Sequence, residues 1–418
     1  MLWEECVDIM NRLIKPVIFC PIDPLGSSIG GIQTFLKGFI KYAPKDFDIE
    51  FIGISSDYKK RPSNKWSKLR LENREFNFFP LFFKKNENKK TLIPLSIRFT
   101  LALKFCNLSL SKRILFFHRI EPALVFKKAN NHKIGVVHND IRKQLEKGRS
   151  EVLWSKFPWL YFMFEKFIFS FLDIVYTVSK NTLDFYHKKY SEQKEKFFFL
   201  PTWIDTEIFY PAINRSKKKL KQDLAKKNKK LSPSNKWIIF VGRLQRQKAP
   251  IRLIQTFAQY HLKDRECHLL IFGKGNLEQK IKKKVVKLGL VSFVHFVGYK
   301  NQSELAEFYR AADCMLLTSN FEGMPMCVSE ALGSGVPVVS TDVGEVNRVI
   351  KNGFSGEVVE SFCPKDIARS LEKVLKNPNV YRSENCVSCI LEYIPEKVLK
   401  PVYELMRKLN YDLDKKQV

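Results

Sequence analysis

The sequence predicts an α/β protein with two domains, each built around a mainly parallel sheet. Its 418 residues exceed what one ordinary hydrophobic core organises. Short apolar runs alternate with helix-like segments in both halves, and a lysine-rich stretch at residues 211–236 separates the halves. We therefore expect one domain at residues 1–205, a second at 206–394, and a C-terminal helix at 395–418 that packs back on the first domain.

The first domain opens with a strand, a glycine-rich loop and a helix. Residues 16–20 form a short apolar run, then come Gly26, Gly30 and Gly31, and a helical pattern runs from residue 32 to residue 42. Later apolar runs that end in polar residues are typical of buried parallel strands. They lie at residues 114–118, 134–138 and 174–179. The carboxyl ends of such strands line a crevice in open α/β sheets.

The lysine-rich connection leads into a second alternation of strands and helices. Asp223 is the only acidic residue between 214 and 236, so we expect a solvated segment with some helix, which like charges keep extended. Helical patterns follow at residues 251–260 and 302–312. The predicted strands are residues 237–241, 268–272, 294–297, 314–317, 336–339 and 356–359.

The composition, 45% hydrophobic and 28% charged, is that of a folded globular protein. The net charge of +29 favours an anionic partner, which could be nucleic acid, anionic lipid or a phosphorylated small molecule. We expect no secretory signal at residues 1–15 and no transmembrane helix. The nine scattered cysteines suggest reduced thiols, and together these features favour a cytoplasmic protein.

A loop and a short helix at residues 321–337 follow one of the predicted strands. The loop contains Glu322 and Gly323, and the helix contains Glu330. A helix start presents free N–H groups and the positive end of its dipole, which suit a phosphate. Carboxylates accept hydrogen bonds from hydroxyl pairs such as a ribose diol. The segment therefore predicts a site for a phosphorylated sugar compound.

This acidic pair, with seven residues between the glutamates, resembles that of retaining glycosyltransferases of the family-4 type, which have the GT-B fold. Other segments resemble that family in the expected order, and the resemblance covers nearly the whole chain. They are residues 178–180, residues 241–244 with Lys248, and residues 271–275. The resemblance implies two Rossmann-like domains facing each other across a cleft.

The resemblance also implies a reaction. A sugar moves from a nucleotide-diphosphate sugar to an acceptor with retention of configuration, without a metal ion or other cofactor. Arg243 and Lys248 would neutralise the leaving diphosphate, and this role also follows from its growing negative charge. The expected donor contacts are Gly30, Gly31, Arg243, Lys248, Gly275, Glu322, Gly323, Met324, Pro325, Met326 and Glu330.

His138 corresponds to the active-site histidine of the family, and the resemblance gives it contact with the transferred sugar or the acceptor. His118, at the end of the preceding predicted strand, is the alternative. One segment departs from the family pattern. Residues 201–205 replace its usual Asn-Gly turn and put Trp203 where a glycine would adopt a positive φ.

The acceptor is expected to be a glycan or a lipid-linked precursor, with peripheral association at the inner face of an anionic membrane. The aromatic stretch at residues 154–171 is interpreted as a packed helix, or alternatively as an interfacial helix, and residues 76–85 weakly support the latter. Two other functions stay open. The fold also suits a sugar-nucleotide epimerase or phosphorylase, and the basic charge suits a nucleic-acid-binding protein, although we expect no nucleic acid partner.

Overall fold

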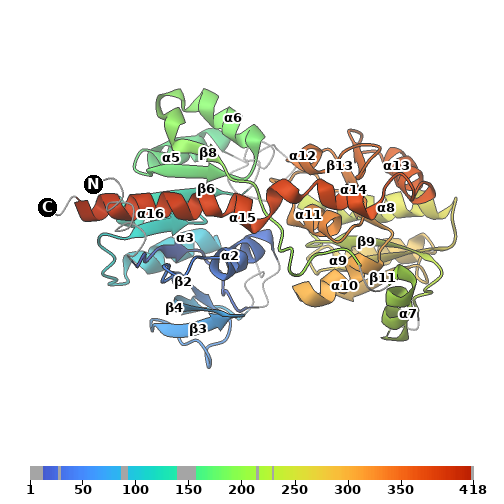
Figure 1. Ribbon diagram of the computed structural model, residues 1–418, viewed down its shortest axis with the longest axis horizontal. Coiled ribbons are helices and arrows are strands. Elements are labelled where there is room, and N and C mark those ends of the chain that lie inside the picture. Colours follow the sequence, from blue (N-terminus) through green and yellow to red (C-terminus); the bar gives the residue numbers. More distant parts are fainter. Residues whose placement is uncertain are drawn as a thin grey trace. The chain divides into compact units, whose positions relative to one another are not determined.

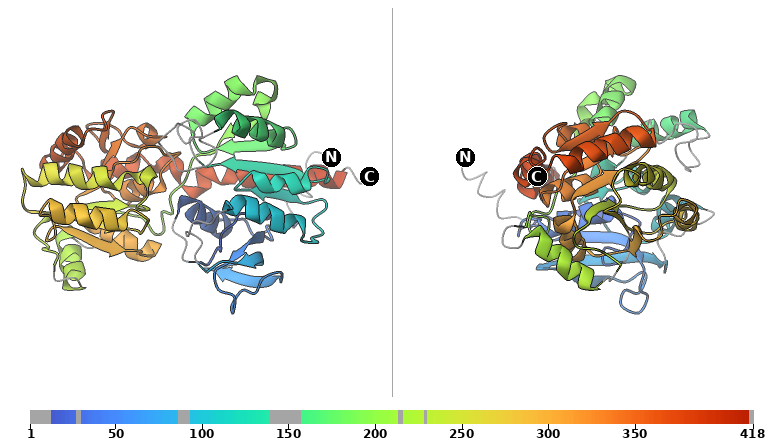
Figure 2. Two further views of the ribbon diagram at one scale, coloured as in Figure 1. Left: turned by 180° about the vertical axis from the view of Figure 1, so that it is seen from behind. Right: turned by 90° about the vertical axis from the view of Figure 1, so that its right-hand side faces the viewer.

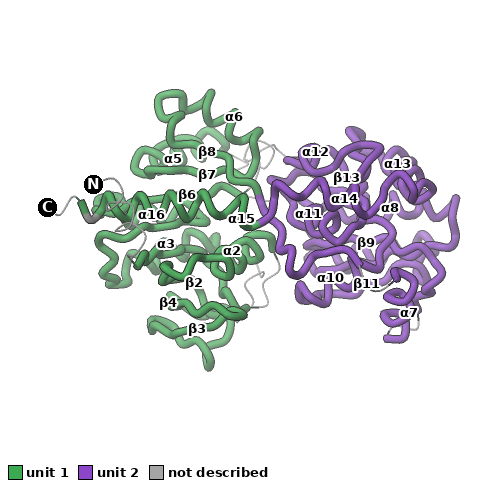
Figure 3. Tube along the Cα trace, viewed as in Figure 1, with its two compact units in different colours: residues 1–138, 157–201, 395–418 green, residues 139–156, 202–394 purple. Residues whose placement is uncertain are grey.

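The computed structural model describes residues 13–26, 30–85, 93–138, 157–212, 216–227 and 230–415. The chain forms two compact units (Figure 3). Unit 1 comprises residues 1–138, 157–201 and 395–418, and unit 2 comprises residues 139–156 and 202–394. Each unit contains one mainly parallel sheet with helices around it, which confirms the predicted α/β class.

Unit 1 is built on an eight-stranded sheet in the order β3-β4-β2-β1-β5-β6-β7-β8. All neighbouring pairs are parallel except β3 and β4. The strands are β1 (Val17–Phe19), β2 (Glu50–Ser55), β3 (Ser67–Leu71), β4 (Arg74–Phe83), β5 (Ile114–Phe117), β6 (His132–Val137), β7 (Ile174–Thr177) and β8 (Phe197–Phe199).

The sequence predicted β1, β5, β6 and β7 and missed the other four strands. The stretch at residues 76–85 illustrates one miss, because its phenylalanines suggested an interfacial segment. In the structure, β4 takes up most of this stretch and buries Phe76, Phe78 and Leu81. Alternate side chains of an inner strand pack on opposite faces, so this strand is apolar because both faces are covered.

The helices of unit 1 include a C-terminal pair that follows unit 2 in the sequence. In α16, Tyr403 donates a hydrogen bond to the carbonyl of Phe39 at 2.7 Å, and Arg407 pairs with Asp46 at 2.8 Å. Figure 1 shows α16 in red, running along unit 1. The helices are α2 (Gly31–Lys41), α3 (Leu95–Lys104), α5 (Pro158–Phe169), α6 (Lys180–Lys189), α15 (Pro395–Val398) and α16 (Lys400–Lys415), with 3₁₀ turns η1 (Glu121–Phe126) and η3 (Ser191–Lys196).

Unit 2 contains a six-stranded sheet in the order β11-β10-β9-β12-β13-β14, and every pair is parallel. All six strands were predicted, two of them with the same bounds and four with bounds that differ by one or two residues. They are β9 (Lys236–Val241), β10 (Cys267–Phe272), β11 (Val294–Gly298), β12 (Cys314–Leu317), β13 (Val338–Thr341) and β14 (Gly356–Val359).

Helices cover both faces of this second sheet (Figure 2). Ile239 packs in a cluster with Tyr309 and Val328, whereas Ile238 packs in another with Phe257 and Leu371. The continuous apolar runs of the sequence are explained by this two-sided burial. The helices are α7 (Lys217–Lys227), α8 (Pro250–His261), α9 (Glu278–Lys287), α10 (Gln302–Ala311), α11 (Met326–Gly333), α12 (Val346–Val349), α13 (Pro364–Lys376) and α14 (Ser383–Ser388), with 3₁₀ turns η4 (Arg246–Lys248) and η5 (Leu391–Tyr393).

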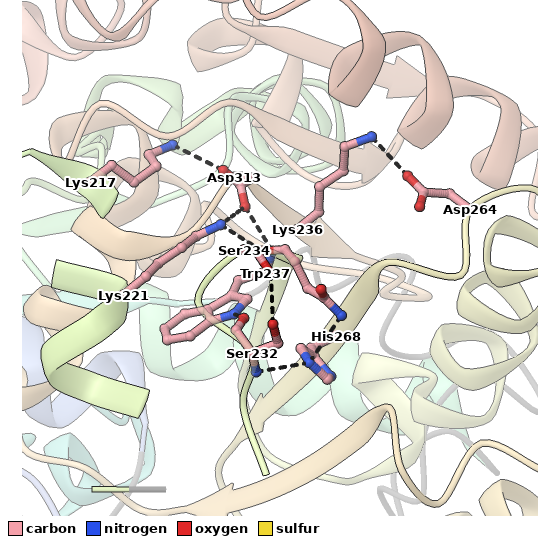
Figure 4. A network of polar contacts seen from close by, with 10 residues as sticks. Lys217, Lys221, Ser232, Ser234, Lys236, Trp237, Asp264, His268 and Asp313 are labelled. Atoms are coloured by element: carbon pink, nitrogen blue, oxygen red, sulfur yellow. Dashed lines mark hydrogen bonds and ion pairs between the residues drawn. The ribbon is translucent and has the colours of Figure 1, made fainter. Parts of the chain in front are cut away.

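The lysine-rich stretch contains the expected helix, α7, but this helix packs into unit 2. Leu220 is buried in the core, and Lys221 forms an ion pair with Asp313 at 2.5 Å (Figure 4). The same carboxylate accepts a hydrogen bond from the backbone N–H of Trp237 at 2.7 Å. Most other residues of α7 are exposed, as expected. The expectation that like charges keep the segment extended is wrong here, because the apolar side of the helix and the partly buried Asp313 carboxylate offset the repulsion between lysines.

Candidate functional site

The loops at the carboxyl ends of β9 and β10 lie against each other with almost no side-chain space between them. A Cβ on Gly273 would lie 2.2 Å from the carbonyl oxygen of Gly242, and one on Gly275 would lie 2.3 Å from that of Leu244. The N–H of Leu244 donates to the carbonyl of Lys274 at 3.1 Å. Glycine is thus required at both positions for the two backbones to approach.

The loop that holds Glu322 is fixed from two sides. Gly344 has a φ of 59°, and a Cβ there would lie 1.9 Å from the carbonyl oxygen of Gly323. The N–H of Glu345 donates to that same oxygen at 2.9 Å. On the other side, the N–H of Asn320 donates to the carbonyl of Gln247 at 2.7 Å. Glu322 therefore sits on a rigid loop, as a positioned functional carboxylate requires.

The half-buried Lys248 and the buried Glu322 form an ion pair in unit 2, with Nζ and Oε1 2.8 Å apart. Burial disfavours the charge on Lys248, but the Glu322 carboxylate outweighs it and raises the pKa of Lys248 above its usual value. The next residue, Ala249, has a left-handed φ of 43°. Such strain in a non-glycine residue often accompanies functional loops. The pair keeps one positive charge in place at neutral pH.

Glu330 lies on α11, of which every residue is buried. The Tyr309 hydroxyl contacts its Oε2 at 3.2 Å. Burial raises the pKa of Glu330 to about 7, although the Tyr309 hydrogen bond and the positive charge of Lys248 oppose this shift. Lys248 thus acts electrostatically on both predicted acidic residues. A ligand that donates hydrogen bonds to Glu330 would favour its charged form.

The other predicted contacts in unit 2 lie on the same loops. Arg243 is half-buried in the loop after β9. Its positive charge lowers the pKa of Lys248, and this is the smallest of the effects on that pKa. Gly323, Met324 and Pro325 are buried and precede α11, which begins at Met326. The first residues of α11 therefore direct backbone N–H groups toward the loop that holds Glu322.

In unit 1, the two candidate histidines contact each other. Nδ1 of His118 and Nε2 of His138 lie 2.9 Å apart, and their rings stack with centroids 5.1 Å apart. Phe35 of α2 lies beside both rings. Burial, with a smaller effect of Arg119, lowers the pKa of His138 to about 3, and burial with His138 lowers that of His118. Both imidazoles are neutral at pH 7.

The two histidines differ in exposure. His118 is 1% exposed, whereas His138 keeps some contact with solvent. His138 can therefore contact a ligand, and His118 can hold its ring from beneath. The alternative between them becomes a division of roles, and the role of each in catalysis stays a prediction.

The loop before α2 is organised by Asp23, which the sequence did not single out. Its buried carboxylate pairs with Arg61 at 2.8 Å and accepts the Ser56 N–H, also at 2.8 Å. Gly30 caps α2, and a Cβ there would meet no described atom within 4 Å. Gly31 is exposed as the first residue of α2. Packing within the described part of unit 1 thus does not demand glycine at residue 30.

Sequence reasoning missed two further partners of the acidic pair. The Gln247 amide donates to the carbonyl of Phe321 at 3.2 Å and lies 3.4 Å from Glu322, and Tyr309 contacts Glu330. A helical tyrosine and a loop glutamine have no distinctive local pattern. Trp203 is buried and is not among the residues with a positive φ, so the chain passes this turn without the glycine geometry.

Two features are absent from the part of the chain that the structure describes. No group of three or more His, Cys, Asp or Glu side chains there is arranged to hold a metal ion. No helix there is both long enough and apolar enough to cross a bilayer.

Residues 221–388 match the family model described as "Glycosyl transferases group 1". Mannosylfructose-phosphate synthase of Agrobacterium fabrum is 27% identical over 225 residues, which are 52% of this chain and 48% of that protein. The chain thus spans about half the length of that curated relative in the alignment. The matching region contains Arg243, Lys248, Glu322 and Glu330.

The fold resembles solved structures along almost the whole chain. Sucrose-phosphate synthase from Thermosynechococcus elongatus has a TM-score of 0.74 at 17% identity, covering 95% of this chain and 99% of that one. Anabaena HepE in complex with UDP and glucose has a TM-score of 0.68 at 14% identity, covering 97% and 99%. These likenesses show the GT-B fold that the sequence predicted.

Proposed function

We propose that this chain, whose residues 221–388 match the family model of the glycosyl transferases group 1, transfers a sugar from a nucleotide-diphosphate sugar to an acceptor. The observation that carries the proposal is the Lys248–Glu322 ion pair, 2.8 Å long, on loops that glycine contacts hold rigid. Sugar transfer needs a fixed positive charge beside a fixed acceptor of hydroxyl hydrogen bonds, and this pair provides both.

The donor is proposed to bind mainly through unit 2. As the bond between the sugar and the diphosphate breaks, negative charge grows on the leaving oxygen. Lys248 and Arg243 would stabilise that charge, together with N–H groups of residues 323–326 at the start of α11. These groups supply positive charge without a metal ion. Gly275, which lets the loops after β9 and β10 approach each other, would contribute a backbone contact to the nucleotide.

The two glutamates are proposed to bind different parts of the donor. Glu322 would accept hydrogen bonds from the transferred sugar and exchange part of its contact with Lys248 for them. Glu330 would accept two hydrogen bonds from the ribose diol. Burial raises the pKa of Glu330 to about 7, so a diol that donates to the carboxylate would bind most tightly above that pH.

We propose retention of configuration by transfer on one face of the sugar. The acceptor oxygen bonds to the anomeric carbon on the side from which the diphosphate leaves, and its proton passes to the leaving phosphate oxygen. The protein then acts by position and charge, without a nucleophile of its own. Anabaena HepE was crystallised with UDP and glucose, which supports a nucleotide hexose as donor.

Unit 1 is proposed to bind the acceptor, a glycan or a lipid-linked precursor, at a cytoplasmic membrane surface. His138 would contact the transferred sugar or the acceptor hydroxyl as a neutral imidazole, and Gly30 and Gly31 would approach the diphosphate. The open space at Gly30 supports this role. The match at residues 221–388 does not favour an epimerase or a nucleic-acid-binding protein.

A thermal-shift screen of UDP-, GDP- and ADP-sugars tests the donor assignment. We expect one nucleotide class to raise the Tm of the wild-type protein and to lose most of that effect in Glu330→Gln, because the amide replaces one of the two acceptor oxygens by an NH2 donor and cannot accept from both hydroxyls with two oxygens. The matched control is Glu165→Gln. Glu165 lies in unit 1 and, like Glu330, is a buried carboxyl that accepts a hydrogen bond from a tyrosine. This control should respond to the donor as the wild type does.

The same nucleotide sugar then tests the reaction. Release of free nucleoside diphosphate that depends on added acceptor supports transfer, whereas a changed sugar without diphosphate release indicates an epimerase. A protein that no sugar nucleotide stabilises, but that binds polynucleotide in ~0.5 M salt, would overturn the proposal.

A further inference from the structure

Helix α5 of unit 1 exposes a stripe of large apolar side chains. Trp159 is 63% exposed, Met163 62% and Phe167 46%. They lie four residues apart, so they share one face of the helix, and Leu160 and Phe157 flank them with 41% and 53% exposure. Scattered apolar residues are ordinary on a surface, but five within eleven positions of one helix indicate a contact surface.

The exposure of this stripe does not come from a loosely packed helix. Ile168 and Phe169 on the other side are fully buried. Glu165 lies buried among three tyrosines and accepts hydrogen bonds from Tyr161, Tyr186 and Tyr190 at 2.8, 2.6 and 3.0 Å. Helix α5 therefore has a fixed orientation, and its apolar face is held toward solvent.

Basic side chains border the stripe. Lys127 lies over the ring of Phe167 at 4.4 Å, and Lys189 of α6 lies over Phe162 at 4.5 Å. Lys166 is exposed on the same side as Met163 and Phe167, whereas the acidic residue of the helix, Glu165, is buried. Three lysines, Lys127, Lys166 and Lys189, thus border the apolar face.

We propose that this face docks on an anionic lipid bilayer. Trp, Phe, Met and Leu side chains are suited to the boundary between head groups and acyl chains, and lysines beside them reach lipid phosphates. A second copy of the chain would bring the same lysines together and repel. The net charge of +29 also favours a strongly negative surface over an ordinary protein partner.

The docking orients unit 1 toward the membrane. The consequence for the acceptor rests on the proposed function. For a lipid-linked acceptor, docking through α5 brings the diphosphate-bearing head group of the lipid close to unit 1, which is proposed to bind the acceptor. The docking itself depends only on the stripe and its lysines, so the two proposals can fail separately.

Flotation with vesicles tests the docking. The wild-type protein should float with vesicles of phosphatidylcholine and phosphatidylglycerol at 7:3, stay behind with phosphatidylcholine alone, and detach in ~0.5 M salt. The triple variant Trp159→Ser, Met163→Ser, Phe167→Ser should bind the anionic vesicles at least about tenfold more weakly, since its apolar insertion is lost.

The matched control replaces three equally exposed apolar residues of unit 2, Leu262→Ser, Val286→Ser and Val291→Ser, whose exposures are 66, 66 and 60%. It should float as the wild type does. Both variants should keep the donor-induced thermal shift, and this result would show that they fold. Because the shift reports donor binding and flotation reports membrane binding, the docking and the proposed reaction are tested separately. Equal flotation of the stripe variant and the wild type, or a wild-type dimer that only the stripe variant dissociates, would overturn the docking.

Discussion

The two units use opposite chemistry for their candidate site residues. In unit 2, Lys248 and Glu322 form a close pair of full charges, and Glu330 lies within the field of the same lysine. In unit 1, His118 and His138 form an equally close pair of 2.9 Å, but burial lowers both pKa values and both rings are neutral. The candidate residues of unit 2 are thus charged, whereas the candidate histidine pair of unit 1 is uncharged.

This difference matches the two ends of a glycosyl transfer. The leaving diphosphate gains charge during the reaction, and only a charge already fixed in place stabilises it without reorganisation. A sugar or acceptor hydroxyl stays uncharged until its proton leaves. Because Nε2 of His138 contacts His118, the other ring nitrogen of this neutral imidazole remains to donate or accept one hydrogen bond that positions the hydroxyl. The comparison therefore predicts different consequences for variants in the two units.

Removing the lysine of the charged pair should have the largest effect. Lys248→Ala leaves Glu322 buried without its ion-pair partner and removes the charge proposed to stabilise the leaving group. We expect kcat/KM to fall by about 10³ or more, and stability to fall by about 3 kcal/mol. Steady-state kinetics with the identified donor and thermal unfolding measure the two effects.

Lys221→Ala is the matched control for this variant. Lys221 is a buried lysine of unit 2, paired with Asp313 at 2.5 Å (Figure 4). Its loss should destabilise the unit by a similar amount and leave kcat/KM within a fewfold of the wild type. If both variants lost activity in proportion to stability, Lys248 would be structural, and the charged character of unit 2 would say nothing about catalysis.

The sequence allowed the strands and the candidate site residues of unit 2 to be predicted. Its six parallel strands are continuous apolar runs, and Arg243, Lys248, Glu322 and Glu330 stand in an order that a local pattern captures. The structure adds how the loops that contain these residues are held in place. Gly275 and Gly344 permit backbone contacts between loops that lie far apart in the sequence, and no local pattern reports such contacts.

Unit 1 was harder to predict because its information is in pairings between distant segments. The paired residues of β2 and β4 lie 27 or 28 positions apart in the sequence, and β4 is apolar enough to suggest a membrane segment. The sequence offered His118 and His138 as rivals, since two separate strand ends give no sign of ring contact. Only the parallel pairing of β5 with β6 brings the two strand ends side by side.

Replacing the histidines should give an intermediate effect that sharpens the neutral side of the comparison. We expect His138→Ala to lower kcat/KM by about 10², because His138 keeps access to a ligand. His118→Ala should cost about tenfold by loosening the ring of His138. The rate of the wild type should show no histidine titration near pH 6.5, since the pKa of His138 is lowered to about 3.

The control is a second buried histidine pair, His268 and His295 in unit 2, with ring nitrogens 3.0 Å apart. His295→Ala tests what the loss of a packed imidazole does to stability alone and should leave kcat/KM nearly unchanged. A drop for His118→Ala as large as that for His138→Ala, or a rate that falls below pH 6.5 with the protonation of one group, would contradict the division of roles.

The smallest expected effect is a pH dependence of stability that Glu330 and Glu165 share across the two units. Burial raises the pKa of each carboxyl to about 7, against an ordinary value of 4.5. The folded protein therefore binds these protons more tightly than the unfolded chain. Each group's contribution is fully present below pH 4.5 and is lost as the pH rises toward 7, by at most about 1.4 kcal/mol per pH unit.

Glu330→Gln and Glu165→Gln should each flatten the fall of Tm between pH 5 and pH 7, because the amide has no proton to lose. The donor distinguishes them. A saturating nucleotide sugar should restore stability above pH 7 in the wild type and in Glu165→Gln, since the proposed diol contact uses only the ionised Glu330. Curves that stay parallel to the wild type in both variants would show that neither carboxyl is protonated in the folded protein. If the nucleotide sugar also restored the stability of Glu330→Gln above pH 7, the donor would bind away from α11. The contrast between a charged site in unit 2 and an uncharged site in unit 1 would then no longer describe donor binding.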